Sequence, residues 1–194
     1  CAWADADGDG LWEFVRGDLQ GMTTALFRED ASGQFAVDPS LNVDGPVNSV
    51  LWCDLDGQHG LDLVIGRPEM MPAIYLHDGS SAWTAVPESE LPELPWSFVS
   101  THITSLDSND DGRRDLAIGS QSVGDNPQLW MNVSAMGQFG SRFHAVDEGA
   151  TFGLDSGRYA RGLAAADFDG DGDHDIALGR PPADLPTGRY YAAR

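Results

Sequence analysis

The chain has 194 residues, 41% of them hydrophobic, and a formal net charge of −20. This is enough apolar material to bury a core, which excludes a disordered polymer, and the strong negative charge disfavours nucleic acids and anionic membrane surfaces as partners. No run approaches the roughly 20 consecutive apolar residues of a transmembrane segment, and two cysteines exclude a disulfide framework.

The first segment of the chain carries an acidic loop at residues 5–13, which reads Asp-Ala-Asp-Gly-Asp-Gly-Leu-Trp-Glu. A short apolar strand is expected directly after it at residues 14–17, and further strands at residues 24–27 and 34–37. Residues 1–4 supply only the tail of a strand that enters the loop. The first unit is therefore expected to be incomplete.

The second segment repeats this order in its clearest form. A strand over residues 47–53 enters the acidic loop at residues 54–62, and a strand over residues 61–65 leaves it. Two more apolar runs, at residues 73–77 and 83–86, follow and are separated by turn-forming residues. Four short strands without a helical period predict an all-β unit.

The third segment has its acidic loop at residues 107–115, followed by the apolar run 116–119. Strands are expected again at residues 128–132 and 142–146. The fourth segment has its loop at residues 167–175 and its apolar run at 176–179. Residues 189–194 predict a third strand with no fourth strand after it, so the last unit is also expected to be incomplete.

The acidic loops start 49, 53 and 60 residues apart, and each apolar run after them ends in glycine. A period of 50 to 60 residues with four short strands is typical of one β-propeller blade. We therefore predict an all-β fold with a single β-propeller region over residues 1–194 and approximate repeats at 1–44, 45–97, 98–157 and 158–194. Incomplete blades at both ends indicate either part of a larger propeller, which is favoured, or blades whose missing strand comes from elsewhere in the chain or from a neighbouring subunit.

The four loops place oxygen ligands at alternate positions, which allows them to converge on one hard cation such as calcium. With the loop residues numbered 1 to 9, side chains at positions 1, 3, 5 and 9 and the backbone carbonyl at position 7 are the expected ligands. They are Asp5, Asp7, Asp9, Leu11 and Glu13; Asp54, Asp56, Gln58, Gly60 and Asp62; Asp107, Asn109, Asp111, Arg113 and Asp115; and Asp167, Asp169, Asp171, Asp173 and Asp175, with Leu11, Gly60, Arg113 and Asp173 acting through their carbonyls.

Calcium is thus the predicted cofactor, with up to four ions and a mainly structural role. The second loop is expected to bind most weakly, because Gln58 replaces a carboxylate at position 5 and His59 stands where glycine would permit a positive φ. The fourth loop is expected to bind best, followed by the third and first. An EF-hand is excluded because its closing Glu at position 12 is replaced by Arg16, Ile65, Ile118 and Leu178.

These residues resemble the FG-GAP or VCBS repeats of integrin-α-like propellers, whose blades carry an Asp-x-Asp-x-Asp-Gly-x-x-Asp loop between their first two strands. The resemblance covers essentially the whole chain. Residues 128–143 and 152–179 also resemble secreted bacterial repeats related to cartilage acidic protein. The resemblance implies a calcium-binding propeller and does not name a ligand.

Catalysis is not favoured by the remaining residues. No zinc-type spacing or nucleophile motif occurs, and the five histidines, His59, His77, His102, His144 and His174, are expected at solvated or edge positions. The six tryptophans, Trp3, Trp12, Trp52, Trp83, Trp96 and Trp130, are expected mostly to pack between blades, with Trp96 the most exposed. Asn132 begins a glycosylation sequon, whose use stays open.

Three functions remain open on the sequence. We favour a non-enzymatic extracellular adhesion or scaffold module that presents propeller loops to a protein or glycan. The alternatives are a self-assembling oligomer or filament subunit and a propeller fragment of a secreted carbohydrate-active enzyme. For Cys1 and Cys53, lipid anchoring through Cys1 at the cell surface, a disulfide between the two, and a buried or incidental thiol are the possibilities, and the last is favoured.

Overall fold

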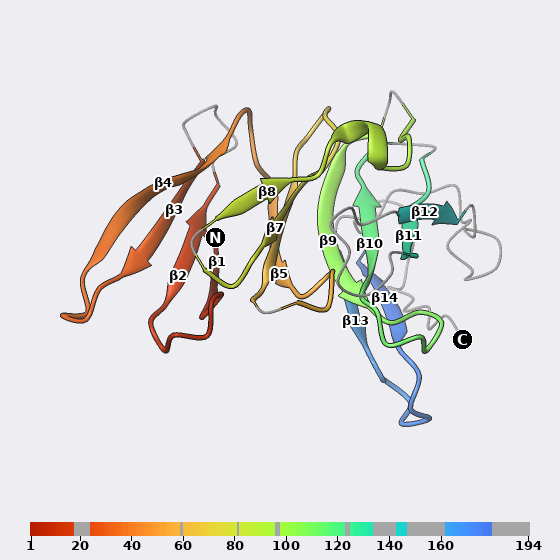
Figure 1. Ribbon diagram of the computed structural model, residues 1–194. Helices are drawn as coiled ribbons and strands as arrows, with labels where there is room; N and C mark the ends of the chain where they lie inside the picture. Colours follow the sequence, from red (N-terminus) through yellow and green to blue (C-terminus); the bar gives the residue numbers. More distant parts are fainter. Residues whose placement is uncertain are drawn as a thin grey trace.

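The computed structural model describes residues 1–17, 24–58, 60–80, 82–95, 98–122, 125–133, 143–146 and 162–179. Over these residues the protein is all-β, with four antiparallel sheets and one short 3-10 turn. The sheets follow one another along the chain and lie side by side (Figure 1). The prediction of an all-β fold built from blade-like units is therefore confirmed.

Each of the first three sheets has four strands in chain order, so every strand pairs with its sequence neighbour. The first sheet contains β1 (Ala2–Ala4), β2 (Glu13–Arg16), β3 (Thr24–Glu29) and β4 (Phe35–Val43). The second contains β5 (Ser49–Cys53), β6 (Asp62–Gly66), β7 (Ala73–His77) and β8 (Trp83–Ala85), and the turn η1 (Glu88–Glu90) follows it. The third contains β9 (Ser100–Leu106), β10 (Asp115–Ser120), β11 (Gln128–Asn132) and β12 (Phe143–Val146). Of the fourth, β13 (Gly162–Ala166) and β14 (Asp175–Gly179) are described.

Most of these strands match the predicted runs within a few residues, but β4 continues to Val43, well beyond the predicted run 34–37. The first unit was expected to be incomplete, but its sheet has four strands. Its first strand is short: β1 has three residues, whereas β5 has five and β9 seven. The prediction of a strand at residues 189–194 lies outside the described residues.

The hydrophobic core lies between the sheets. One cluster joins the first and second sheets and includes Val15, Leu26 and Leu63. A larger cluster, which includes Trp130, joins the second and third sheets, and a smaller one joins the third and fourth. Face-to-face packing between successive sheets therefore holds this part of the chain together, as expected for propeller blades.

Successive side chains along a strand lie on opposite faces of its sheet. In β6, Leu63 packs toward the first sheet, whereas the next residue, Val64, packs toward the third. In β10, Leu116 packs toward the second sheet and Ala117 toward the fourth. We call the face toward the preceding sheet the front face and the opposite one the rear face.

The structure corrects two predictions about aromatic residues. Trp130 is fully buried, and Trp52 and Trp83 pack against the core between the first and second sheets, but Trp3 and Trp12 are exposed. His77 is buried instead of solvated, because it ends a central strand and stacks on Trp83 with ring centroids 4.3 Å apart. His102 is exposed as expected, whereas His59 and Trp96 lie outside the described residues.

The two cysteines do not form a disulfide: Cys1 is exposed and free, and Cys53 is free and buried. The buried-thiol interpretation is therefore right for Cys53. Among the described residues, no helix has the length and apolar character needed to cross a membrane.

Candidate metal centres

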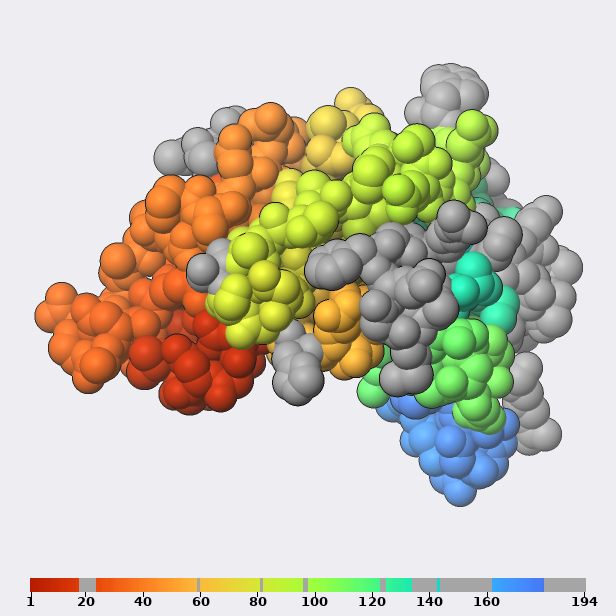
Figure 2. Space-filling view, viewed as in Figure 1, coloured from red at the N-terminus to blue at the C-terminus, as the bar shows by residue number. Residues whose placement is uncertain are grey.

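All four acidic loops connect the first and second strands of their sheets, and they lie along the same edge of the molecule, at the bottom of Figure 1. The fourth loop projects at the lower right of Figure 2. This placement follows from the topology, because every sheet is a meander that starts in the same direction. The predicted hairpin position of the loops is thus what the structure shows.

Backbone turns inside the loops are closed by the aspartate side chains. The position-6 N–H donates to the position-1 carboxylate in three loops, with Gly10 to Asp5 at 3.1 Å, Gly112 to Asp107 at 2.8 Å and Gly172 to Asp167 at 3.1 Å. These glycines have φ of 87°, 80° and 102°, a region that L side chains rarely adopt.

The second loop departs from this pattern at its end. Its glycines with positive φ are Gly57, at position 4, and Gly60, at position 7, with φ of 71° and 113°. A Cβ added at Gly60 would lie 2.7 Å from Nδ1 of His77. The expectation of strain at His59 itself falls on a residue outside the described ones.

The carboxylate at position 9 is a buried brace in every repeat. One of its oxygens accepts the N–H of position 2, in the pairs Ala6–Glu13 at 2.8 Å, Leu55–Asp62 at 2.7 Å, Ser108–Asp115 at 2.9 Å and Phe168–Asp175 at 3.0 Å. In the second and third sheets the other oxygen accepts an N–H from the third strand, of His77 at 2.8 Å and of Asn132 at 2.7 Å. This residue therefore ties the loop to the sheet as well as facing the loop interior.

Three of the loops bring predicted ligands together. One carboxylate oxygen from each of positions 1, 3 and 9 lies within 4.8 Å of the others in Asp5–Asp7–Glu13, Asp54–Asp56–Asp62 and Asp167–Asp169–Asp175. Oxygens bound to one Ca²⁺ at about 2.3–2.6 Å have separations of this size. In the first loop, Oδ1 of Asp5 is buried and has no hydrogen-bond partner, as expected for an atom whose partner is an ion. The donor set therefore fits calcium.

Position 5 is not part of these groups. The Asp9 and Asp171 carboxylates accept the position-7 N–H of Leu11 at 2.8 Å and of Asp173 at 3.1 Å. In the second loop the N–H of Gln58 bonds to Asp56 at 2.9 Å. These bonds help to fix the backbone turns of the loops.

The third loop shares the backbone-to-carboxylate bonds of the first and fourth loops but carries Asn109 at position 3. Positions 1, 3 and 9 therefore contribute two carboxylates, Asp107 and Asp115, instead of three. The Asp111 carboxylate pairs with the guanidinium of Arg113 and accepts the amide of Asn109 at 3.0 Å. The guanidinium of Arg113 thus neutralises the Asp111 carboxylate, which a bound metal would otherwise neutralise.

An arginine also reaches into the first loop. Nη1 of Arg28, on β3, lies 2.8 Å from Asp7 and 3.4 Å from Glu13, and its Nε pairs with Asp38. Register places Arg28 directly opposite Glu13 on β2. Two predicted ligands therefore share an internal cation, with which a bound metal would compete.

Burial raises the pKa of several of these carboxyl groups. The pKa of Asp62 rises to about 7, chiefly because burial disfavours its charge, and the pKa values of Glu13 and Asp56 rise for the same main reason. A cation held by these oxygens would restore the favourable interaction that burial removes. In the first two loops, a bound cation would thus stabilise carboxylates whose charge burial disfavours.

Neighbouring loops are in direct contact with one another. The carbonyl of Ala6, in the first loop, accepts the N–H of Leu61 from the second at 2.7 Å. The carbonyl of Leu55, in the second loop, accepts the amide of Asn132 from the third sheet at 2.7 Å. Both carbonyls belong to position 2, so this position links one repeat to the next.

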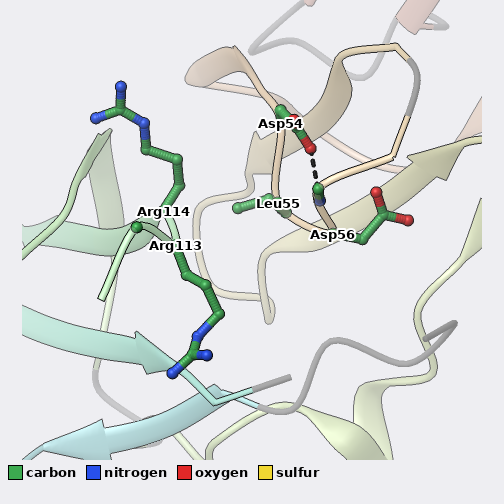
Figure 3. Close-up of a pocket in the computed structure, with 7 residues that line it drawn as sticks. Asp54, Leu55, Asp56, Arg113 and Arg114 are labelled. Atoms are coloured by element: carbon green, nitrogen blue, oxygen red, sulfur yellow. Dashed lines mark hydrogen bonds between the residues drawn. The ribbon is translucent and has the colours of Figure 1, made fainter. Parts of the chain in front are cut away.

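A pocket of about 160 Å³ lies between the second and third loops, lined by Asp54, Leu55, Asp56, Gly57, Gly112, Arg113 and Arg114. In Figure 3 the aspartates stand on one side, and Arg113 and Arg114 extend from the other. The dashed line marks the bond from the Gly57 N–H to Asp54 at 2.8 Å. The pocket therefore joins an acidic wall to a basic one.

The third and fourth loops also approach each other. The nearby carboxylate of Asp110 raises the pKa of Asp173. Two like charges at this contact are unfavourable unless a cation or a proton lies nearby. The four loops thus form a continuous row along the edge of the sheets.

Hairpin-borne acidic loops repeated on successive four-stranded sheets define a class of β-propeller-type repeat protein. Residues 159–194 match the family model of the FG-GAP repeat. This segment includes the fourth acidic loop, and the FG-GAP resemblance inferred from the sequence is confirmed. A comparison with proteins of curated function finds no match.

Proposed function

We propose that this chain is a calcium-clamped, non-enzymatic extracellular module that presents its row of loops to a protein or glycan ligand. The observation that supports this most strongly is the gathering of carboxylate oxygens within 4.8 Å in three separate loops. Repetition at equivalent positions argues against chance clustering on an acidic surface. FG-GAP similarity in the fourth repeat supports the same conclusion.

An extracellular setting suits such loops because calcium there is millimolar. Extracellular modules bind calcium with dissociation constants of about 10⁻⁴–10⁻³ M. An ion present at ten times its dissociation constant adds about 1.4 kcal/mol per site. Several sites together approach the marginal stability of a domain, so calcium would serve the role that disulfides serve in other secreted proteins.

A non-enzymatic role follows from how the acidic residues are used. The loop carboxylates are engaged as braces, turn closures and metal ligands, so they are poorly placed to act as general acids or bases. The exposed loop edge and the pocket between the second and third loops then provide the binding surface. Binding to arrayed glycans without release of sugar products would support this role, and release of unsaturated sugars would contradict it.

Calcium titration of the chelated chain by isothermal calorimetry tests the metal assignment. Asp167→Asn, in the fourth loop, is expected to lower the binding stoichiometry by one ion. Glu93→Gln removes the same charge from an exposed residue outside the loops and is expected to leave the titration unchanged. The proposal fails if the native chain gives no saturable calcium heat, or if Asp167→Asn titrates like the native chain.

A further inference from the structure

The pocket between the second and third loops is held open by a buried cross-link. The side-chain amide of Asn132, which is fully buried, donates to the carbonyl of Leu55 at 2.7 Å and to the carbonyl of Arg114 at 3.2 Å. Leu55 lies on the acidic side of the pocket and Arg114 on the basic side. One side chain therefore fixes the separation of the two walls, and a preformed pocket spares a ligand the cost of ordering it.

The two arginines of the basic wall differ in how far their charge is already neutralised. The guanidinium of Arg113 pairs with Asp111, and its Nε donates to the carbonyl of Asn132 at 2.8 Å. Arg114 is exposed and forms no ion pair with another residue that the structure describes. In Figure 3 its side chain diverges from that of Arg113. The positive charge of Arg114 is thus available to a ligand at the rim of the pocket.

The acidic wall decides whether an anion can enter. It carries Asp54 and Asp56, and Asp56 lines the pocket although it is only 4% exposed. Without metal these two carboxylates repel an anion. A Ca²⁺ held by them would offset both charges and leave Arg114 as the unpaired charge. Charges beyond about 8 Å are largely screened at physiological ionic strength, so this local balance sets the sign of the pocket despite the formal net charge of −20.

The second loop offers calcium fewer charged oxygens than the first and fourth loops. Position 5 holds the neutral Gln58. Both oxygens of Asp62 already accept backbone N–H groups, at 2.7 and 2.8 Å, which reduces what they offer an ion. Ca²⁺ takes about 6–8 oxygen ligands. Since Asp54 and Asp56 line the pocket, oxygens of a ligand bound there would complete the shell.

The size and lining of the pocket favour a sugar that bears a carboxylate. Pockets for drug-sized ligands measure about 300–1,000 Å³, so about 160 Å³ accommodates one small unit. Among the described residues that line it, Leu55 is the only apolar side chain, and the aromatic anchors typical of protein interfaces are missing. A Cβ added at Gly112 would meet nothing within 4 Å, which leaves that rim open. A uronate ring offers a carboxylate to Arg114 and hydroxyl groups to calcium and the aspartates.

We propose that the calcium-loaded pocket between the second and third loops binds a uronate residue of an acidic glycan. The sugar carboxylate pairs with Arg114, and sugar oxygens complete the coordination of the calcium ion of the second loop. This inference rests on the proposed calcium function and narrows its ligand to sugars that bear a carboxylate. Because the metal-free pocket repels such a sugar, chelation of calcium releases it.

Biolayer interferometry tests this proposal with two immobilised oligosaccharides, one ending in glucuronate and the other identical but ending in glucose. At saturating calcium the native chain is expected to bind only the glucuronate probe and to release it in EDTA. Arg114→Gln is expected to weaken this binding about tenfold or more, since it removes a charged partner of the carboxylate. Arg16→Gln removes the same charge from an exposed residue of the first sheet and is expected to bind like the native chain.

Calcium calorimetry on the same variants separates a failure of this inference from a failure of the calcium function. Arg114→Gln is expected to keep the native calcium stoichiometry, whereas Asp54→Asn is expected to lose one calcium ion and the glucuronate probe together. A native chain that binds calcium but not the probe, or prefers an aspartate-rich peptide to it, overturns the ligand assignment alone. Equal probe binding by Arg114→Gln does the same. Probe binding that persists in EDTA overturns the calcium dependence, and a native chain without saturable calcium heat overturns both proposals.

Discussion

Replacing Asp62 with asparagine is expected to have opposite effects with and without calcium. Asp62 is fully buried, its oxygens accept two backbone N–H groups, and its pKa is raised from 3.8 to about 7. In EDTA at pH 8 the native carboxylate is therefore ionised at a cost of about 4 kcal/mol relative to the unfolded chain, since each pKa unit is worth about 1.36 kcal/mol.

Asparagine removes this buried charge but has only one acceptor oxygen. Leaving one buried N–H unpaired costs about 1–3 kcal/mol, so the variant is expected to be about 1–3 kcal/mol more stable than the native chain in EDTA at pH 8. At about 2–4 °C per kcal/mol for a chain of this size, a melting experiment resolves this difference. With saturating calcium the order reverses, because the ion stabilises the native carboxylate and the variant has lost a closing ligand.

The pH dependence gives a second check on the same reasoning. A raised pKa means that the folded, metal-free state binds more protons than the unfolded state, so stability present at low pH is lost as the pH rises through about 7. The advantage of Asp62→Asn in EDTA should therefore shrink as the pH falls from 8 to 5. Asp54→Asn, exposed in the same loop, is the control: it should change little in EDTA and lose stability only with calcium. A variant at Asp62 that is less stable than the native chain in EDTA at pH 8 would refute the argument.

Three further predictions concern groups outside that loop. Arg28→Gln is expected to tighten calcium binding at the first loop several-fold, since it removes a competing cation, while it lowers the melting temperature in EDTA; unchanged first-loop affinity in calorimetry would contradict this. Asn132 is fully buried and its amide donates to the Leu55 carbonyl, so mass spectrometry of chain secreted by eukaryotic cells should find it unglycosylated, and Asn132→Ala should cost about 1–3 kcal/mol in denaturant unfolding. Burial raises the pKa of Cys53 to about 12, so a thiol reagent should label Cys1 quickly and Cys53 only on unfolding, whereas two rapidly labelled thiols would be the contrary result.

The strands and their order were accessible from the sequence because the repeat supplies four examples of one pattern. Alternating apolar residues around the second loop predicted β5, β6 and β7 closely, and the loop positions placed each hairpin. The spacing of the expected calcium ligands likewise predicted that the carboxylates at loop positions 1, 3 and 9 lie close together, as they do in three loops.

What the sequence did not reveal depends on contacts between distant residues. Arg28 enters the first loop from another strand, and its pairing with Asp7 spans 21 residues. Tryptophans were predicted as packing residues from strand position alone, but burial of Trp3 depends on a neighbouring sheet in front of β1. The recurring carboxylate at position 9 predicts a metal ligand from the sequence, whereas its hydrogen bonds to two backbone N–H groups, at Asp62 and Asp115, become evident only in the folded hairpin.

The position-2 carbonyls of Ala6 and Leu55 link the first three repeats thermodynamically. Each repeat contributes an intrinsic stability and a coupling to its neighbour, as in a one-dimensional chain of interacting units. An ion that orders one loop also fixes the carbonyl of Ala6 or Leu55 that the following repeat uses. Calcium bound in the first or second loop would then lower the ordering cost of the repeat that follows, so on chelation these repeats should lose order together instead of one independent loop at a time.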